Sequence, residues 1–561
     1  MSFEEKNSEE GRQSQLPRTA NPEPIASQGR QLTYLTGWRL HMTTFGLCIG
    51  LFLVNLEVTI VSTSSLAIAN DLHSYDQLGW ILTGYLITYT GFIMIWAKFS
   101  DYFGQKSSVI ASSLIFVLFS GGCGAAQTIT QLIVCRVFQG IGAAGGFALG
   151  ILFFTGMVPK EKFPLYGAVL SSTVALANLA GPLLGGALSK NSQWRWVFLL
   201  NVPVSLFSII ILLFSIPTGF PYHNQTASSP TFTWPTVNTL VASYKKIDYL
   251  GAGMLLFGSL LLSAGLLESG KTWEWRSAPA ICILVIAGVL FIAFFAWERL
   301  VSSDRWTQEP MFPWKFVHNR VWMGVLLSSL LNGLPFFVLV IFVPQRLETV
   351  HGESPVQAGI KILPYTLVAA VGAVIASLIV STGRIAPIYI MLFFSALGAV
   401  GTGLLTTITS TEYIPNEFYG YLTLIGLGIG GTWGLTVPFV GHAVDQMDVS
   451  SACGALIQFR ILGGALGIAI MSATMETYLR QQLPSTLSPV QLSAILKSTT
   501  AISLLPPELQ AHVIEVFAQG YSLQLKIVTG FSVAQFLAIT MIWRNPQIMF
   551  AERKKKENIG S

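Results

Sequence analysis

The sequence is poor in charge and in cysteine for a chain of 561 residues. Only 11% of its residues are charged, against about 25% in ordinary soluble domains, and 52% are hydrophobic. The net charge of +5 is too small and too scattered to favour nucleic acid as a partner. The five cysteines lie inside apolar runs and have no His or second Cys at metal-ligand spacing, so we expect neither a disulfide framework nor a metal site. This composition is typical of a polytopic membrane protein.

Long apolar runs occupy most of the chain. A helix needs about 20 apolar residues to cross roughly 30 Å of hydrocarbon, and fourteen runs meet this requirement. We place them at 41–67, 77–97, 107–126, 131–156, 165–188, 196–216, 249–268, 279–298, 321–344, 361–381, 387–408, 418–444, 451–476 and 521–543.

The segments between these runs divide the chain into regions. Lys and Arg are more frequent in the tails and loops that lie inside when both termini are cytoplasmic. The predicted regions are a disordered cytoplasmic N-tail (1–39), a six-helix bundle (40–216), a cytoplasmic linker (217–247), a two-helix hairpin (248–299), a second six-helix bundle (300–543) with a long external loop (477–520), and a basic C-tail (544–561). We expect short surface helices in the external loop, beginning near Ser488 and Pro506. Asn224 in the linker matches the glycosylation pattern, and we expect it to be unmodified because the linker is cytoplasmic.

Glu57 is the one carboxylate among some two dozen apolar positions of the first run. A charge in the membrane is costly, so ionisable residues there usually face a cavity and carry function; a Glu hydrogen-bonded to a neighbouring helix is the structural alternative. Arg136 begins the segment Arg-Val-Phe-Gln-Gly of the fourth run. A rise of about 1.5 Å per residue puts both side chains at a similar depth, which permits a direct or water-mediated contact. Snorkelling to the outer headgroups is the alternative for Arg136.

The fifth run contains Gly181-Pro182-Leu183-Leu184-Gly185-Gly186 at its centre. In water these residues would end a helix, but inside a membrane neighbouring helices can satisfy the freed backbone groups. We therefore expect a bend and a face of close helix contact, with a packing seam of no further role as the alternative. Gly426, Gly430 and Gly434 recur every four residues in the twelfth run, which predicts a second packing face.

The order and spacing of these segments resemble one protein family. The run at Gly181, the segment Trp194-Arg195-Trp196 and Asn201-Val202-Pro203 are similar to the antiporter motif of the major facilitator superfamily, in its fourteen-helix drug:proton antiporter branch. The segments 97–106, 136–144 and 459–467 resemble further motifs of this branch, and the resemblance covers roughly residues 40–545. Fungal multidrug and secondary-metabolite exporters are the most similar type.

The resemblance implies an all-α major facilitator fold with two six-helix bundles, an extra two-helix hairpin and a central cavity. It also implies a role for four groups of residues: proton coupling by Glu57 and Arg136, a cytoplasmic latch at Asp101, Gly104 and Lys106, the antiporter motif at Gly181, Pro182, Gly185 and Gly186, and a second-half motif at Arg460, Gly463 and Gly464. For Arg460 a structural or latch charge is favoured over a ligand for substrate. Glu57 stands where the family usually has Asp, and Gln105 where it usually has Arg.

The function implied is export of an amphipathic organic compound, such as a drug, toxin or secondary metabolite, driven by inward proton flow. Siderophore-type uptake on the same fold and a non-transporting membrane receptor are the alternatives. We expect no enzyme activity and no cofactor, because no nucleophile–base or metal constellation occurs. We expect a monomer in the plasma membrane, with the vacuolar membrane as the alternative.

Residues 265–272 satisfy the phosphate-loop pattern G-x-x-x-x-G-K-[ST] letter by letter. The pattern binds nucleotides only where a strand precedes the loop and a helix begins after it. Here an apolar run of helical length precedes it, so we do not expect nucleotide binding.

Overall fold

The computed structural model describes residues 34–550 except for several connecting segments. The segments outside the description are 73–77, 160–161, 191–192, 218–219, 221–246, 270–272, 304–307, 409–412, 446–447 and parts of 485–504. The predicted N-tail up to residue 33, the C-tail from 551 and Asn224 therefore lie outside the described residues.

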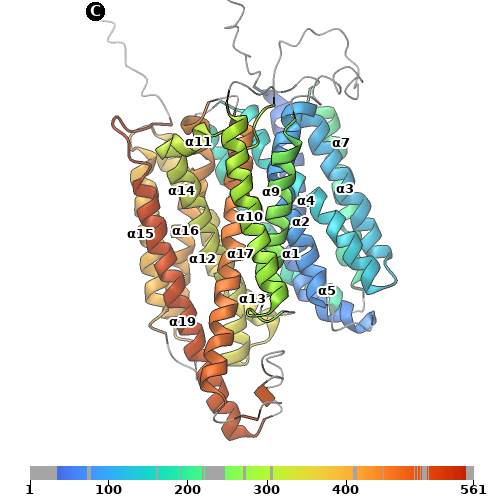
Figure 1. Cartoon of the computed structure of the whole chain (residues 1–561), viewed down its shortest axis with the longest axis vertical. Helices are drawn as coiled ribbons and strands as arrows, with labels where there is room; N and C mark the ends of the chain where they lie inside the picture. Colours follow the sequence, from blue (N-terminus) through green and yellow to red (C-terminus); the bar gives the residue numbers. More distant parts are fainter. Residues whose placement is uncertain are drawn as a thin grey trace, which may run out of the picture.

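The described residues up to Ser215 form seven helices, most of which are labelled in Figure 1. They are α1 (Gly37–Asp71), α2 (Leu78–Phe103), α3 (Gln105–Ala125), α4 (Ile129–Met157), α5 (Phe163–Lys190), α6 (Arg195–Leu199) and α7 (Asn201–Ser215). The short α6 continues almost directly into α7, and the two together make one span, Arg195–Ser215.

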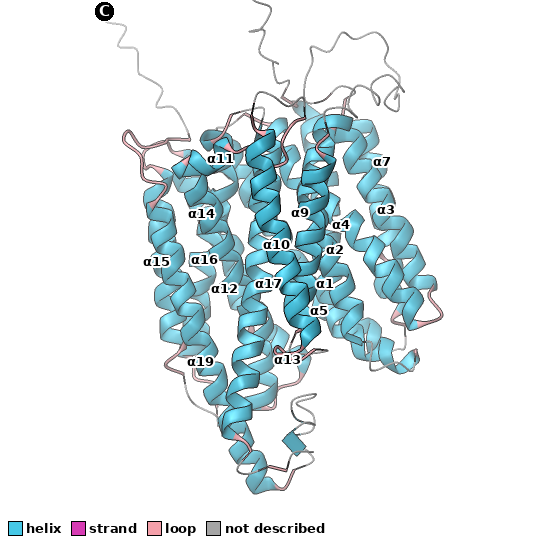
Figure 2. Ribbon diagram, viewed as in Figure 1, coloured by secondary structure: helices cyan, strands magenta, loops and turns pink. Residues whose placement is uncertain are grey.

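A helical hairpin and a second group of helices follow. The hairpin consists of α9 (Tyr249–Glu268) and α10 (Ala278–Val301). The second group consists of α11 (Lys315–His318), α12 (Arg320–His351), α13 (Pro355–Lys361), α14 (Leu363–Ser381), α15 (Pro387–Leu405), α16 (Glu417–Ala443), α17 (Val449–Gln482) and α19 (Pro507–Thr540). The described residues contain no strand, only two isolated bridges (Figure 2).

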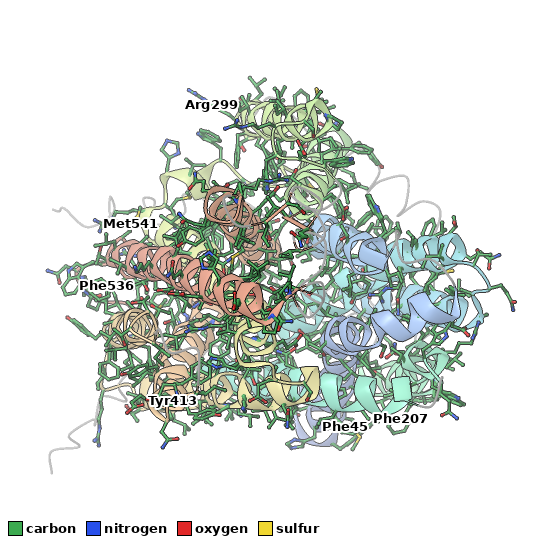
Figure 3. The ribbon with its side chains drawn as sticks, turned by 90° about the horizontal axis from the view of Figure 1, so that it is seen from below. Phe45, Phe207, Arg299, Tyr413, Phe536 and Met541 are labelled. Atoms are coloured by element: carbon green, nitrogen blue, oxygen red, sulfur yellow. The ribbon has the colours of Figure 1, made fainter. Side chains whose placement is uncertain are left out.

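The described residues contain fourteen helical spans that are long and apolar enough to cross a membrane, as the hydropathy of the sequence predicts. Large apolar side chains remain exposed on the outer helices, which is the arrangement a lipid-facing surface requires. Phe45 and Phe207, for example, lie at the rim of the molecule seen from below (Figure 3) and are 52% and 53% exposed.

The helices on both sides of the predicted external loop 477–520 extend into it. Helix α17 continues to Gln482, and α19 begins at Pro507 as one uninterrupted helix, where we expected a short surface helix. The projecting ends are stabilised by an apolar cluster of their own, which a hydropathy window over a single segment does not reveal. Its buried members are Val350, Leu479, Leu483, Leu487, Ile495, Ile502, Leu505, Val513, Val516, Phe517, Ala518 and Tyr521.

The helices before the hairpin pack mainly on one another, and so do those after it. The two groups meet where α5 lies against α14 and α16, and where α2 and α4 lie against α17. The hairpin rests on α2 and α17, and the Gln458 Nε2 of α17 donates a hydrogen bond to the Ser259 Oγ of α9 at 2.6 Å. The exact limits of the two six-helix bundles stay a prediction.

Glycines bring α16 into backbone contact with α14. A Cβ added at Gly426 would lie 2.5 Å from the Tyr365 carbonyl oxygen, and one at Gly434 would lie 2.8 Å from the Ala373 Cβ. The four-residue spacing on both helices gives the packing face expected from the sequence.

Candidate functional site

Glu57 lies in the middle of α1 and is completely enclosed by the first group of helices. Its Oε1 accepts a hydrogen bond from Arg136 Nη1 at 2.6 Å, and its Oε2 accepts one from Asn201 Nδ2. The carboxylate therefore joins α1 to α4 and to the start of α7. Both charged side chains have 0% exposure, so the ion pair is shielded from solvent.

Arg136 is held by further contacts from α2 and, through Gln139 on its own helix, from α3. Its Nε donates to the Ile81 carbonyl of α2 at 3.0 Å, and its guanidinium lies 4.2 Å from the centre of the Tyr85 ring. Its Nη1 also donates to Gln139 Oε1 at 2.7 Å, and Gln139 Nε2 in turn donates to Ser120 Oγ of α3 at 2.7 Å. Snorkelling, the alternative considered from the sequence, does not describe this side chain. We call Glu57, Arg136, Gln139, Asn201 and Ser120 the buried polar cluster.

Sequence reasoning did not assign roles to Asn201, Gln139 or Ser120. Asn201 and Gln139 do belong to the quoted motifs, and a polar amide in an apolar run was the available signal. Their partners could not be named, because the rotation of each helix was unknown. The Oδ1 of Asn201 is buried and has no hydrogen-bond partner.

The antiporter motif packs α5 directly against α1, close to the buried polar cluster. A Cβ added at Gly181 would lie 2.6 Å from the Thr59 Cβ, two residues beyond Glu57. The carbonyl of Gly185 accepts a hydrogen bond from Ser64 Oγ at 3.3 Å. Helical structure continues through the whole motif. The surroundings of Pro182 and Gly186 lie outside the described part of the chain.

The predicted latch brings the two groups of helices together at one residue. The Asp101 carboxylate lies beside the Ser450 side chain in the first turn of α17, where the helix dipole favours a negative charge. A Cβ added at Gly454, one turn further, would lie 2.7 Å from the Ala97 Cβ. Gly104 joins α2 to α3 with a φ of +85°, a conformation that only glycine adopts readily.

Lys106 does not take part in this contact between the groups. Its Nζ donates hydrogen bonds to the carbonyls of Leu213 at 2.8 Å and Ile216 at 2.6 Å, so it binds the C-terminal end of α7 within the first group. A lysine is favourable there because carbonyls left unpaired at a helix end carry partial negative charge. These two contacts of Lys106 stay within the first group, and its role in a latch between the two halves stays a prediction.

A lysine on α11 ties the start of α17 to its own group of helices. Lys315 Nζ lies 3.1 Å from Asp445 Oδ2 and 2.5 Å from Asp448 Oδ2. Burial lowers the pKa of Lys315, but its hydrogen bonds and charge pairing with the two aspartates outweigh this effect and raise the pKa above the usual value.

Arg460 lies at the meeting of the two groups. It lines two cavities, of about 20 and 40 Å³, formed mainly by α5 on one side and α16 on the other. Its guanidinium carbon lies 3.6 Å from the centre of the Trp433 ring and 4.8 Å from that of Phe336. Gly463 and Gly464 bring α17 against Leu330 and Phe337 of α12. Among the described residues no hydrogen-bond acceptor reaches the buried Nε of Arg460, and its role as a structural charge, a latch charge or a ligand for substrate stays a prediction.

The phosphate-loop pattern has the wrong surroundings for nucleotide binding. Gly265 lies inside α9, where an added Cβ would come within 2.8 Å of Leu284 Cδ2 on α10. A helix thus occupies the place of the required strand. Residues 270–272 lie outside the described residues.

The family model of the Major Facilitator Superfamily matches residues 47–468. The chain belongs to this superfamily. It is a multi-pass membrane transporter, and the resemblance of its sequence motifs to this superfamily is confirmed.

Curated relatives are similar over nearly the whole chain. The "MFS-type transporter FPY5" of Fusarium mangiferae is 37% identical over 91% of this chain and 85% of that protein. The "MFS thioclapurine efflux transporter tcpA" of Claviceps purpurea is 28% identical over 92% of each. Among solved structures, the human organic anion transporter MFSD10 covers 89% of this chain and 99% of its own, with a TM-score of 0.56 and 13% identity. At this identity the likeness shows the fold alone.

Proposed function

We propose that this protein exports amphipathic organic compounds, such as drugs, toxins or secondary metabolites, in exchange for protons. It acts as a monomer in a lipid bilayer, the plasma membrane rather than the vacuolar membrane. Several relatives carry names of fungal efflux pumps, which supports the direction of transport. The observation that supports proton coupling is the buried ion pair between Glu57 and Arg136. A carboxylate inside a membrane is costly, so a residue of this kind usually has a function.

The buried polar cluster can exist in two protonation states. In the charged state Glu57 accepts from Arg136 and from Asn201. In the neutral state the carboxyl becomes a donor on one oxygen, and the unpartnered Oδ1 of Asn201 can accept a hydrogen bond from this O–H after the amide group rotates. Arg136 then loses its counter-charge, which favours a rearrangement of α1, α4 and α7.

Protonation and substrate binding act on one alternating structure. The cavities beside Arg460, of about 20 and 40 Å³, hold only a few water molecules, so an organic substrate enters only after the two six-helix bundles separate at one end. If Glu57 takes its proton from outside and releases it inside, and substrate favours the opposite state, proton flow drives export.

Proton-driven flux in proteoliposomes tests this proposal. Glu57→Gln keeps the size of the side chain and mimics the permanently neutral form, so it should still bind substrate in detergent but fail to move it against a gradient. Wild type with the pH gradient collapsed by an ionophore is the control. Uphill pumping by Glu57→Gln at the wild-type rate would place the coupling site elsewhere.

The same vesicles separate the alternative functions. Proton-dependent flux in the direction of uptake would indicate a siderophore-type importer. Binding without flux in either direction would indicate a receptor.

A further inference from the structure

Arg136 and Arg460 are buried arginines in spanning helices of the first and the second group, and their surroundings differ. Arg136 has a carboxylate, an amide oxygen and a backbone carbonyl as partners. Arg460 is 9% exposed, and none of the described residues forms a hydrogen bond or an ion pair with it. Its Nε is buried without an acceptor. The positive charge of Arg460 is therefore uncompensated by a negative one.

An arginine side chain does not escape this situation by losing its proton, because guanidinium stays charged in proteins. The rings of Trp433 and Phe336 stabilise the cation through their faces but supply no hydrogen-bond acceptor. A buried charge without a counter-charge is unfavourable, so a site built in this way gains from an anion that fills it.

Aromatic and apolar side chains line the cavities beside Arg460, and such a lining suits a flat molecule. Neither lining contains Asp, Glu or Lys, so Arg460 alone sets the charge. Trp433 lines both cavities, and Phe336 and Ile429 line the larger one. A few polar side chains lie among these apolar groups: Ser171, Asn178 and Thr366.

We propose that Arg460 binds the negative group of the substrate, and that the exported compound is an organic anion with a flat apolar body that packs against Trp433. The negative group can be a carboxylate, which presents two oxygens to the planar guanidinium. It can also be an ionised enol, whose negative charge is delocalised. This inference rests on the proposed function and names its substrate class. Export of an anion against inward protons moves positive charge into the cell on both counts, so an inside-negative membrane potential accelerates it.

The test compares two probes of the same shape, 2-naphthoate and its neutral amide, 2-naphthamide. We expect purified wild-type protein to bind naphthoate at least tenfold more tightly in isothermal titration, since a hydrogen bond to an ionised group is stronger than a neutral one. Arg460→Gln should bind both probes alike. Arg460→Lys should keep part of the preference, because lysine retains the charge but not the planar fork.

Arg346→Gln is the matched control. Arg346 is also a buried arginine with unpartnered nitrogens, but it lines a separate cavity within the second group of helices. The preference for naphthoate should be unchanged in this variant. If Arg460→Gln does not remain monodisperse in gel filtration, Arg460→Lys decides the question, and an unaltered preference there would reject the assignment.

Equal affinity of wild type for the two probes would overturn the inference, and so would a full preference in Arg460→Gln. Neither result depends on transport. Proton-driven export of neutral compounds without an anion preference would reject this inference and leave the proposed function intact. A strong anion preference without proton-driven flux would support this inference and reject the proposed function.

Discussion

Glu57 is a longer side chain than the aspartate usual at this position of the family, and its two oxygens contact donors on two different helices. One contact reaches Arg136 on α4 and the other reaches Asn201 at the start of α7. The extra methylene of glutamate carries the carboxylate further from α1, where it contacts both α4 and α7. We therefore expect the length as well as the charge of this side chain to matter for coupling.

Glu57→Asp should retain proton-dependent flux at a reduced rate. The shorter acid keeps its negative charge but reaches only one of its two partners, and the loss of one hydrogen bond to a charged group costs about 1.5–3 kcal/mol. We expect a reduction of about tenfold or more in the initial rate of proton-driven flux in proteoliposomes. Wild-type rates would show that the contact with Asn201 does not matter, and complete loss would show that both contacts are required.

At the scale of helices, the contact between α1 and α5 connects the antiporter motif with the buried polar cluster. Gly181 faces Thr59, and the Gly185 carbonyl receives the Ser64 hydroxyl. Because Thr59 lies two residues from Glu57, a movement of α5 along α1 would pass beside the carboxylate that we propose to couple proton flow. We therefore expect close packing at this contact to matter for movement between cavity states as well as for stability.

Gly181→Leu and Gly185→Leu should reach the membrane in normal amounts but lose transport. Overpacking of a helix contact costs about 1–3 kcal/mol. A large helical protein can still fold at this cost, but the same free energy strongly shifts an equilibrium between two cavity states of similar stability. Gly288→Leu on α10 is the control, since that glycine has open space around it and should transport normally. Surface labelling measures the amount of protein, and flux in the same vesicles measures transport. Normal flux from Gly181→Leu would show that the motif has no role in transport beyond helix packing.

At the scale of the whole molecule, the two groups of helices are held together at the predicted cytoplasmic end by α2 and α17. Asp101 meets the first turn of α17, and Ala97 meets Gly454 one turn later. The residue between these contacts on α17, Cys453, is 1% exposed. Its thiol is therefore a natural reporter of opening at this end.

Asp101→Asn should accelerate labelling of Cys453 by a membrane-permeable maleimide. The substitution removes a charge that the N-terminus of α17 stabilises by about 0.3–1 kcal/mol, and 1 kcal/mol corresponds to about a fivefold change in an opening equilibrium. Asp101→Glu keeps the charge and should label at nearly the wild-type rate. Cys453→Ala supplies the background from the other cysteines. An unchanged rate in Asp101→Asn would show that this contact does not hold the end closed.

The sequence by itself determined the class of protein, the fourteen spans and the glycine faces. These follow from local properties, because a bilayer accepts only helices whose length and hydropathy match its thickness, and a repeat of small residues every four positions marks a close contact. Two features predicted in this way are the separate helices α9 and α10 and the glycine face of α16 that contacts α14.

The tertiary structure alone decided which side chains meet. A helix that is apolar all round carries no signal for its own rotation, so the sequence left open that Asn201 would reach Glu57, that Lys106 would bind the end of α7, and that Arg460 would face a cavity. The extension of α17 and α19 beyond the predicted spans has the same origin. It depends on an apolar cluster assembled from segments distant in the chain, and only packing brings those segments together.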